Sequence, residues 1–389
     1  QSSIWPLLGY RARTMKPSAQ TAIPCLLMRG GTSKGPFFNE ADLPSEIPLR
    51  DKVLLAALGS PDKRQIDGLG GAHPLTSKVG IVRKSSVPGV ALDFLFAQLQ
   101  PDKETVDTTP NCGNMLAAVV PFAIETGMVD VQGDQSTFRV LTLNTDMQCD
   151  ITVDTRGGMV QYEGTARIDG SPGTSAPVTI NFLDTAGSVC SGLLPTGRVK
   201  DTLTVTGAGF EPFTIDVTCI DNGMPVVCLN AADFDISGYE TPAELEANQD
   251  LRDRVEAIRL AVGERMNLGD VTNKTVPKMS LLSPAKDGGL INTRTFIPHR
   301  AHDAIGVLGA VSVATACMLK GSVAAKIAGI TEITDSLDIE VEHPTGFFTV
   351  QMEVDQSGSE LKITKSALLR TARLLMCGNI FVPKSAWEN

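Results

Sequence analysis

Residues 108–127 read TTPNCGNMLAAVVPFAIETG, and this stretch decides the fold that the sequence predicts. After the polar group NCGN, the chain is apolar on every side from Gly113 to about Glu125. A helix on the surface would show a polar face, so a helix of this composition must be enclosed by other elements. We therefore expect a helix at the centre of a domain, with Cys112 at its start.

The second half of the chain repeats the order of elements of the first half. An apolar run leads into a tight turn at CLLMRGGTSKG (25–35) and again at VTCIDNGMPVVCL (217–229). A lysine then opens a β-like run, at Lys78 in the first half and at Lys278 in the second. A second all-apolar helix is expected at 304–319, and alternating strands follow each helix.

This internal repeat predicts an α+β fold of two similar domains, each a curled, mostly antiparallel and barrel-like sheet wrapped around a central buried helix. We place the N-terminal domain at 21–200 and the C-terminal domain at 201–389, with a disordered or added extension at 1–20. Two such domains would leave a cleft between them, where small-ligand sites commonly lie. An amphipathic helix at 242–260 is expected as a surface insertion.

Composition and charge exclude several classes of partner. Lys and Arg total 34 against 44 Asp and Glu, a net charge of −10, and no basic run is present that could follow a phosphate backbone. The longest uncharged apolar stretch, 304–319, has 16 residues, whereas a membrane-spanning helix needs about 20. We expect neither nucleic acid nor membrane as a partner. On so acidic a protein, local cations or backbone amides must hold an anionic substrate.

The cysteines are scattered and form no CxxC pair. Disulfide frameworks belong to small secreted chains, so we expect reduced thiols, a cytoplasmic location and mostly buried cysteines. The four histidines lack a metal-ligand arrangement, and DGLGGAH lacks the spacing of a dinucleotide loop, so neither a metal nor a cofactor is expected. The eight cysteines are residues 25, 112, 149, 190, 219, 228, 317 and 377.

Cys112 and Lys78 are the residues that we expect to move protons. Asn111 suits a helix cap, and the partial positive charge of a helix N-terminus favours thiolate over thiol. Lys78 leads into an apolar β run, and burial of a lysine favours the uncharged amine that a general base requires. The alternatives are a cysteine that only fills space and a lysine that extends to the surface.

Two further groups of residues are candidates for binding an anion. The turn MRGGTSKG does not have the order of a Walker loop, but its glycines expose N–H groups, and Thr32, Ser33 and Lys34 add donors. It is either a carboxylate-binding turn or a simple hairpin loop. Arg294 and Arg300 precede the second apolar helix, where they would either bind a substrate carboxylate or form surface ion pairs.

Several motifs together resemble the family of 4-oxalomesaconate tautomerases and methylaconitate isomerases, whose members are similar to diaminopimelate epimerase in fold. The resemblance covers nearly all of the chain from about Thr21, and QIDGLGG, NTRTFIPHR and GAVSVATAC are most similar to the tautomerase branch. The motifs, in chain order, are CLLMRGGTSKG, RQIDGLGG, LTSKV, NCGN, CIDNGMPVV, MNLGD, VPKMSLL and RTARLL.

The resemblance implies two similar domains with the site between them and no cofactor or metal. By position, Lys78 and Cys112 correspond to the pair that moves protons. Positions that hold the substrate correspond to Thr32, Ser33, Asn111, Gly113 and Asn114. We add residues of the same motifs and of the loop before the second helix as further substrate-binding residues, namely Lys34, Ser77, Met224, Lys278 and Arg300.

One departure from the epimerase pattern bears on the reaction. The epimerases place a cysteine at the start of both central helices, whereas the second start here reads PHRAHDAIGV and Cys317 lies well inside the helix. A symmetric two-thiol racemase is therefore not expected. Instead, an uncharged Lys78 would remove a proton, backbone amides near Gly31 and Gly113 would hold the oxyanion, and Cys112 would protonate the far end. Lys78 and Cys112 could also exchange roles.

The function implied by the resemblance is a cofactor-independent isomerase that shifts a proton in an unsaturated tricarboxylic keto acid. The expected substrate is 4-oxalomesaconate, from the catabolism of gallate and protocatechuate rings. The alternatives are an isomerase of 2-methylaconitate or 3-methylitaconate, an amino-acid racemase, and a non-catalytic carboxylate-binding accessory protein. The expected partner is a small di- or tricarboxylate, and a homodimer is left open.

Overall fold

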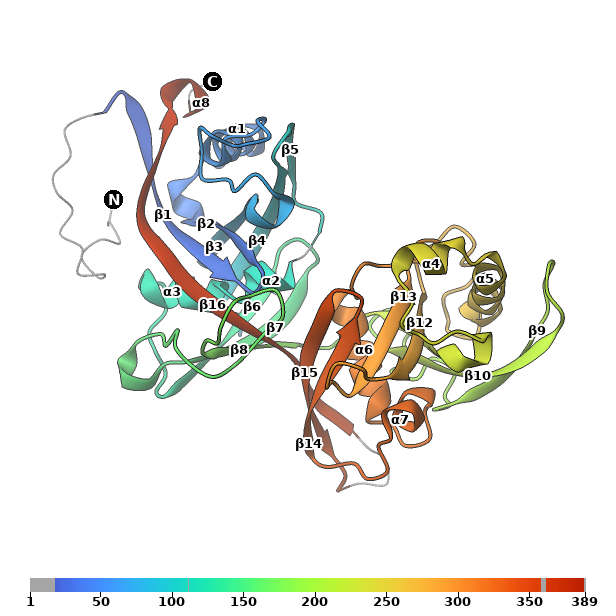
Figure 1. Ribbon diagram of the computed structural model, residues 1–389. Coiled ribbons are helices and arrows are strands. Elements are labelled where there is room, and N and C mark those ends of the chain that lie inside the picture. The colour runs from blue at the N-terminus through green and yellow to red at the C-terminus, as the bar shows by residue number, and fades with distance from the viewer. Residues whose placement is uncertain (1–17, 111, 358–361, 388–389) are drawn as a thin grey trace. The chain divides into compact units, whose positions relative to one another are not determined.

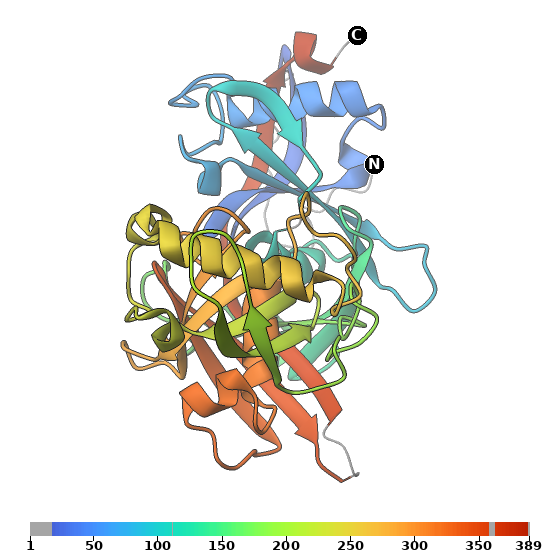
Figure 2. The ribbon, with the colours of Figure 1, turned by 90° about the vertical axis from the view of Figure 1, so that its right-hand side faces the viewer.

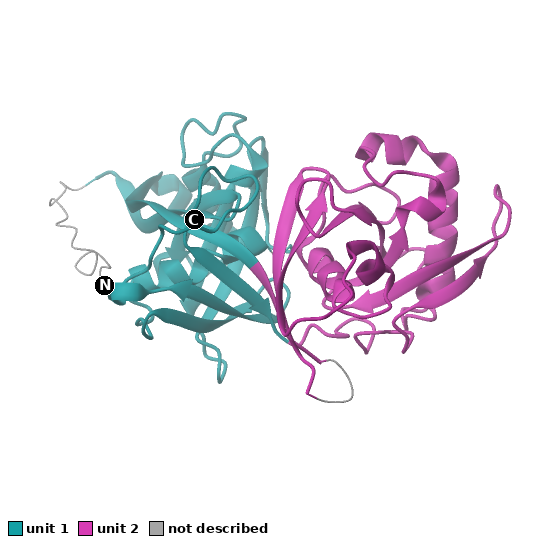
Figure 3. Cartoon of the chain, turned by 60° about the horizontal axis from the view of Figure 1, so that its bottom comes forward, with its two compact units in different colours: residues 1–183, 369–389 teal, residues 184–368 magenta. Residues whose placement is uncertain are grey.

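The computed structural model describes residues 18–110, 112–357 and 362–387 and divides into two compact units. One unit holds residues 1–183 and 369–389, and the other holds residues 184–368 (Figure 3). The chain thus divides at 183/184, before the loop that leads to β9, whereas the predicted boundary follows residue 200, and the last residues lie with the first unit. Of the predicted extension, residues 1–17 lie outside the described residues, and the first strand begins at Gln20.

The first unit is a mixed sheet with helices on both faces (Figure 1). Its helices are α1 (Ile47–Leu58), α2 (Gly113–Leu116), α3 (Val119–Glu125) and α8 (Lys384–Trp387), with 3₁₀ turns η1 (Glu40–Asp42), η2 (Pro74–Thr76) and η3 (Arg156–Gly158). Its strands are β1 (Gln20–Gly30), β2 (Ser33–Asn39), β3 (Lys78–Lys84), β4 (Leu92–Gln100), β5 (Lys103–Asp107), β6 (Gln135–Thr142), β7 (Met147–Asp154), β8 (Pro177–Phe182) and the later part of β16 (Lys362–Pro383).

The second unit repeats this plan with one more long helix (Figure 2). Its helices are α4 (Pro242–Ala247), α5 (Gln249–Gly263), α6 (Val307–Cys317) and α7 (Val323–Ala328), with the 3₁₀ turn η4 (Ala231–Phe234). Its strands are β9 (Asp201–Val205), β10 (Phe213–Asp221), β11 (Pro225–Asn230), β12 (Lys278–Pro284), β13 (Ile291–Phe296), β14 (Ser336–His343), β15 (Gly346–Asp355) and the first part of β16.

Strand pairing confirms the internal repeat. In the first unit β1–β2, β3–β4, β6–β7 and β7–β8 are antiparallel, while β2–β3 and β4–β6 are parallel. In the second unit β10–β11, β12–β13, β14–β15 and β15–β16 are antiparallel, while β11–β12 and β13–β14 are parallel. The central helices come at the same place in both orders, after β4 and β5 in one unit and after β13 in the other. The predicted α+β fold is confirmed.

Alternation along the strands explains why both faces of each sheet are covered. Successive side chains of a strand point to opposite faces. In β11, Val226 and Cys228 pack in the cluster around α6, whereas Val227 and Leu229 pack in the cluster around α5. A strand with no polar residue in this run must be buried on both sides, as parallel pairs usually are.

The first unit follows the same rule with two neighbouring phenylalanines of β2. Phe37 lies 5.8 Å from Phe122 of α3 between ring centroids, and Phe38 belongs to the cluster that contains Leu54 and Leu58 of α1. The sheet is thus covered by α3 on one face and α1 on the other. The placement of α2 beside β1, β2 and β3 follows from this packing.

The predicted helices are found, but two of them are interrupted. The apolar helix at 113–125 divides into α2 and α3, because Pro121 has no N–H to donate to the carbonyl of Ala117 and its ring crowds that carbonyl. The amphipathic helix divides at Asn248, whose side chain accepts a hydrogen bond from Leu251 N and so begins α5. Among the described residues, no helix is both long and apolar enough to cross a membrane.

Candidate functional site

The side chains of Lys78 and Cys112 meet inside the first unit. Lys78 is the first residue of β3 and Cys112 is the cap residue of α2, and these two elements are in contact. Lys78 Nζ lies 3.5 Å from Cys112 Sγ. The two residues are only 8% and 7% exposed, so amine and sulfur meet in a place that holds little water. An amine and a thiol can each accept or donate a proton, and their separation allows both to reach one small carbon acid.

The surroundings hold Lys78 in one position. Its Nζ lies 5.0 Å from the ring centroid of Phe96, a cation–π contact when the amine is protonated. The preceding residue, Ser77, donates hydrogen bonds to Gln65 Oε1 at 2.9 Å and to the carbonyl of His73 at 2.8 Å. The Ser77 hydroxyl is thus used within the protein, and it holds the start of β3. The motif RQIDGLGG contains Gln65, which the sequence analysis left without a role.

The glycine turn between β1 and β2 is tied to the first turn of α2. Asn114 Nδ2 donates to Thr32 Oγ1 at 3.1 Å, and the Thr32 N–H donates to Asn114 Oδ1 at 3.4 Å. The Gly31 N–H donates to the carbonyl of Thr371 at 2.8 Å. Backbone amides near Gly31 were predicted to hold an oxyanion, but the amide of Gly31 itself already donates to Thr371. Thr32 and Asn114 fix the turn against the helix that carries Cys112.

Ser33 has a side chain that remains available for a bound group. It is 1% exposed, and its hydroxyl has no hydrogen-bond partner among the residues that the structure describes. A buried hydroxyl without a partner costs free energy, which an acceptor in a ligand would recover. Lys34 follows it in β2 and is half-buried, Gly113 opens α2, and Asn111 lies outside the described residues.

We expect Gly31→Ala to destabilise the turn. Gly31 has a φ of +53°, and a Cβ there would lie 2.1 Å from Asn114 Oδ1. The variant should lose about 1–3 kcal/mol of unfolding free energy from backbone strain, and a further ~1 kcal/mol from the displaced Asn114 hydrogen bonds. Urea unfolding measures the loss. Gly89→Ala is the matched control, because Gly89 has a φ of +79° and open space around its Cβ position. Equal losses in both variants would contradict the Asn114 contact.

Lys278 and Met224, two of the predicted binding residues, lie in the second unit. Lys278 opens β12 as Lys78 opens β3, and its Nζ donates to the carbonyl of Thr275 at 2.6 Å. Burial lowers the pKa of Lys278, and the charge of Arg259 adds to the effect. The carbonyl of Met224 accepts a hydrogen bond from Ser312 of α6 at 2.7 Å. The roles of Lys278 and Met224 in binding stay predictions.

The two arginines before α6 have different surroundings. Arg294 is buried and directs its guanidinium at the protein itself, with donors to Asn292 and to the carbonyls of Tyr239, Glu240 and Thr293. The predicted carboxylate fork is therefore wrong for Arg294. The Arg300 side chain is 85% exposed and lies 3.8 Å from Glu246, which matches the surface ion pair given as its alternative.

Most of the other cysteines fill space, as predicted. Burial raises the pKa of Cys25 and Cys317 to about 12, and burial is also the main cause that raises the pKa of the remaining thiols. These thiols stay protonated at neutral pH. The remaining five are Cys149, Cys190, Cys219, Cys228 and the half-buried Cys377. Cys112 differs from these in facing an amine.

Arg370 is a buried cation near Cys112 to which the sequence analysis gave no role. It lies on β16, is 3% exposed and belongs to the motif RTARLL. Burial lowers its pKa to about 10, and negative charge on Cys112 acts in the opposite direction. The guanidinium therefore remains charged at neutral pH. Sequence spacing could not find it, because more than 250 residues separate it from Cys112.

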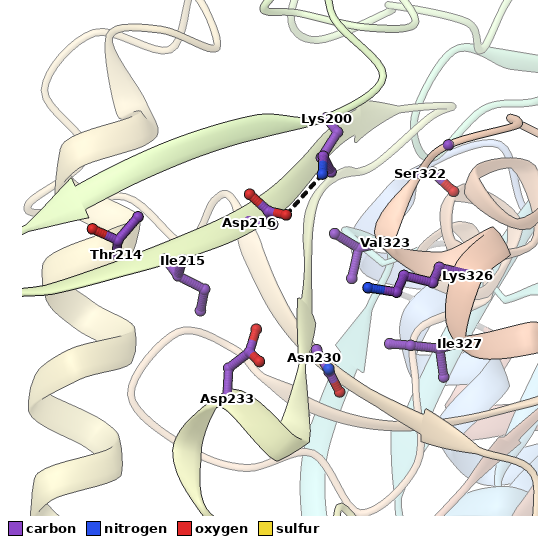
Figure 4. Close-up of a pocket in the computed structure, with 11 residues that line it drawn as sticks. Lys200, Thr214, Ile215, Asp216, Asn230, Asp233, Ser322, Val323, Lys326 and Ile327 are labelled. Atoms are coloured by element: carbon purple, nitrogen blue, oxygen red, sulfur yellow. Dashed lines mark hydrogen bonds and ion pairs between the residues drawn. The ribbon is translucent and has the colours of Figure 1, made fainter.

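A separate hollow of about 500 Å³ lies in the second unit, and no predicted site residue lines it (Figure 4). Lys200 and Asp216 form an ion pair of 2.8 Å at its wall, and Asp233 and Lys326 add one charge of each sign. This balance of charge does not suit a polycarboxylate, which needs an excess of cations. In the described ranges, no three His, Cys, Asp or Glu side chains gather as a metal site requires, and the predicted absence of a metal stays a prediction.

Comparison with known proteins places this geometry in a family. The PrpF protein family matches residues 20–383. The chain belongs to the PrpF family. A (4E)-oxalomesaconate Delta-isomerase of Novosphingobium sp. is 54% identical to this PrpF protein over 359 residues, with 92% of the chain and 97% of the relative covered. A 4-oxalomesaconate tautomerase of Pseudomonas putida is 51% identical over 368 residues, with 95% and 98% covered.

A solved structure supports the fold of this PrpF protein. The crystal structure of a methylitaconate-delta-isomerase matches it with a TM-score of 0.82 at 32% sequence identity, with 96% of this chain and 98% of that chain covered. These relatives are named as isomerases or as a tautomerase, and this member of the PrpF family is an isomerase.

Proposed function

We propose that this protein isomerises 4-oxalomesaconate by moving a proton between two carbon or oxygen positions, with Lys78 and Cys112 as the proton-carrying groups. The observation that carries the proposal is the 3.5 Å separation of Lys78 Nζ and Cys112 Sγ in a buried place. The 54% and 51% identity to relatives named for oxalomesaconate supports the substrate.

The chemistry requires one base and one acid near the same small molecule. A proton next to the conjugated keto acid is acidic because the resulting carbanion spreads into the carbonyl as a dienolate. One member of the pair accepts this proton, and the other donates a proton to the far end of the delocalised system. The difference from a racemase is that the two groups need not lie on opposite faces of a single carbon.

Substrate binding must overcome the negative charge of the protein. The formal net charge of −10 repels a tricarboxylate, so nearby cations and hydroxyls have to hold it. The Ser33 hydroxyl is buried and unsatisfied in the described structure, and Lys34 follows it on β2. We propose Ser33 as a carboxylate-binding residue, since by alternation along β2 its side chain shares the face of Phe37, toward α3. Lys34 leaves β2 on the opposite face, and its role in binding stays a prediction.

An isomerase of 2-methylaconitate or 3-methylitaconate is the second candidate, because the same pair would serve it and a methylitaconate-delta-isomerase has the same fold. Its identity to this chain is 32%, well below that of the oxalomesaconate enzymes. A carboxylate-binding protein without activity does not need a buried amine and thiol in contact, and so the structure gives no reason to prefer it.

A panel assay tests the substrate. Turnover of 4-oxalomesaconate, 2-methylaconitate and 3-methylitaconate is followed by ultraviolet absorbance. We expect kcat/KM for 4-oxalomesaconate to exceed the others by at least about tenfold, since its keto group delocalises the carbanion, which neither methyl acid can do. 3-Methylitaconate also has one carboxylate fewer and so loses a charged hydrogen bond. Higher kcat/KM on either methyl acid would contradict the substrate, and no turnover of any acid would contradict the enzyme.

We also propose that the reaction belongs to the breakdown of gallate and protocatechuate rings and occurs in the cytoplasm. The support for the location is that all eight cysteines are free thiols, which suits a reducing compartment.

A further inference from the structure

The Arg370 side chain lies against the turn that positions Cys112. A Cβ at Gly31 would lie 3.1 Å from Arg370 Cδ and 2.1 Å from Asn114 Oδ1, so both side chains flank the same glycine. Asn114 is two residues from Cys112 in the first turn of α2. The next residue of β16, Thr371, accepts the hydrogen bond from Gly31 N. The strand β16, the glycine turn and the first turn of α2 therefore meet at Gly31, with Arg370 on one side and the helix start that carries Cys112 on the other.

The charge of Arg370 reaches Cys112. Negative charge on Cys112 favours the protonated form of the Arg370 guanidinium. By the same attraction, the positive charge of Arg370 stabilises negative charge on the sulfur. Both residues are less than 10% exposed, so little solvent screens the interaction. A fixed cation in a nearly water-free place acts on a neighbouring anion without first having to reorganise.

We propose that Arg370 is a positioning residue that stabilises negative charge on the sulfur of Cys112 during proton transfer. The proposal rests on the proposed function of Cys112. When Cys112 protonates the dienolate, its S–H bond breaks, a C–H bond forms and the electron pair stays on sulfur as thiolate. Arg370 keeps its own protons throughout. In this direction Lys78 has already taken up the substrate's proton, and the fixed charge of Arg370 adds to the charge of the lysine ammonium.

A purely structural role would make the shape of the arginine important and its charge unimportant. Arg370→Lys and Arg370→Gln both remove the guanidinium fork and differ in charge, so the two variants separate these roles. The readout is the rate at which iodoacetamide alkylates Cys112 at neutral pH, followed by peptide mass spectrometry on the full chain. Only the thiolate reacts at a useful rate, so the rate reports negative charge on sulfur.

We expect Arg370→Gln to slow the alkylation of Cys112 by about tenfold or more, and Arg370→Lys to stay within about threefold of the wild-type rate. Arg373→Gln is the matched control, because Arg373 is exposed on the same strand, and it should react like the wild type. Equal rates for Arg370→Gln and Arg370→Lys, or a wild-type rate for Arg370→Gln, would overturn the proposal.

The proposal can still be tested if the Arg370→Gln variant does not fold. If thermal melting shows that Arg370→Gln is unfolded, Arg370→Met replaces it, because methionine also removes the charge and keeps an unbranched stem. A folded Arg370→Lys variant with a loss of more than about tenfold would overturn the proposal by itself. The alkylation rate does not depend on turnover, so failure of the proposed function would instead appear as full activity in Cys112→Ala.

Discussion

Lys78→Met is expected to lower kcat for 4-oxalomesaconate by about 10²- to 10⁴-fold, the usual contribution of a general acid or base. Methionine has a similar length and can occupy the same buried space beside Phe96, but it carries no proton. The loss should appear in kcat, because the amine acts on the reacting proton, and less in KM. Steady-state kinetics by ultraviolet absorbance measures both.

The control for this variant lies on the same strand. Lys84 ends β3, is exposed and is far along the strand from the cysteine contact, so Lys84→Met should retain the wild-type kcat. Circular dichroism and thermal melting should show that both variants are folded. A folded Lys78→Met enzyme with near-normal turnover would remove Lys78 from the mechanism.

Cys112→Ala is expected to cause a loss of similar size, about 10²- to 10⁴-fold in kcat. Alanine keeps the start of α2, since the Cys112 side chain makes no capping hydrogen bond. What disappears is the sulfur that lies 3.5 Å from Lys78 Nζ, and with it one of the two groups that can hold the proton. The same kinetic assay applies.

Cys317→Ala provides the comparison for Cys112→Ala. Cys317 is fully buried in α6, and burial raises the pKa of its thiol to about 12, so the thiol stays protonated and does not give up its proton near neutral pH. The substitution should cost about 1 kcal/mol of stability through lost packing and leave kcat unchanged. If Cys317→Ala reduced kcat as strongly as Cys112→Ala, thiol chemistry could not be assigned to Cys112.

Much of the fold could be predicted because the two halves of the sequence repeat the same order of elements. The apolar helices and the lysine-led strands follow from periodicity alone, and the structure repeats the same strand order in both units. Lys78 and Cys112 were predicted as the proton-moving pair, but they were expected to face each other across a gap between the two domains, whereas both side chains lie in the first unit.

Other features depend on contacts between distant parts of the chain. The return of residues 369–389 to the first unit is set by pairing of β16 with β1, which leaves no local signal. Arg294 and Arg370 are both buried arginines, yet Arg294 directs its donors at Asn292 and three backbone carbonyls, whereas the charge of Arg370 interacts with that of Cys112. Backbone amides near Gly31 were predicted to hold an oxyanion, but the carbonyl of Thr371 accepts the hydrogen bond of the Gly31 amide. The burial and the hydrogen-bond partners of Arg294, Arg370 and the Gly31 amide distinguish their roles, and neither property can be read from the sequence.

Deuterium transfer tests the central claim most directly. The enzyme isomerises protonated substrate in D₂O, and NMR and mass spectrometry measure the isotope at the newly protonated position after a single turnover. If one of Lys78 and Cys112 accepts the substrate proton and the other donates, the donor has exchanged its own proton for deuterium from the solvent. The product then carries deuterium at that position. A product that keeps the original proton there would show that one group carries it across, and would contradict a mechanism built on two.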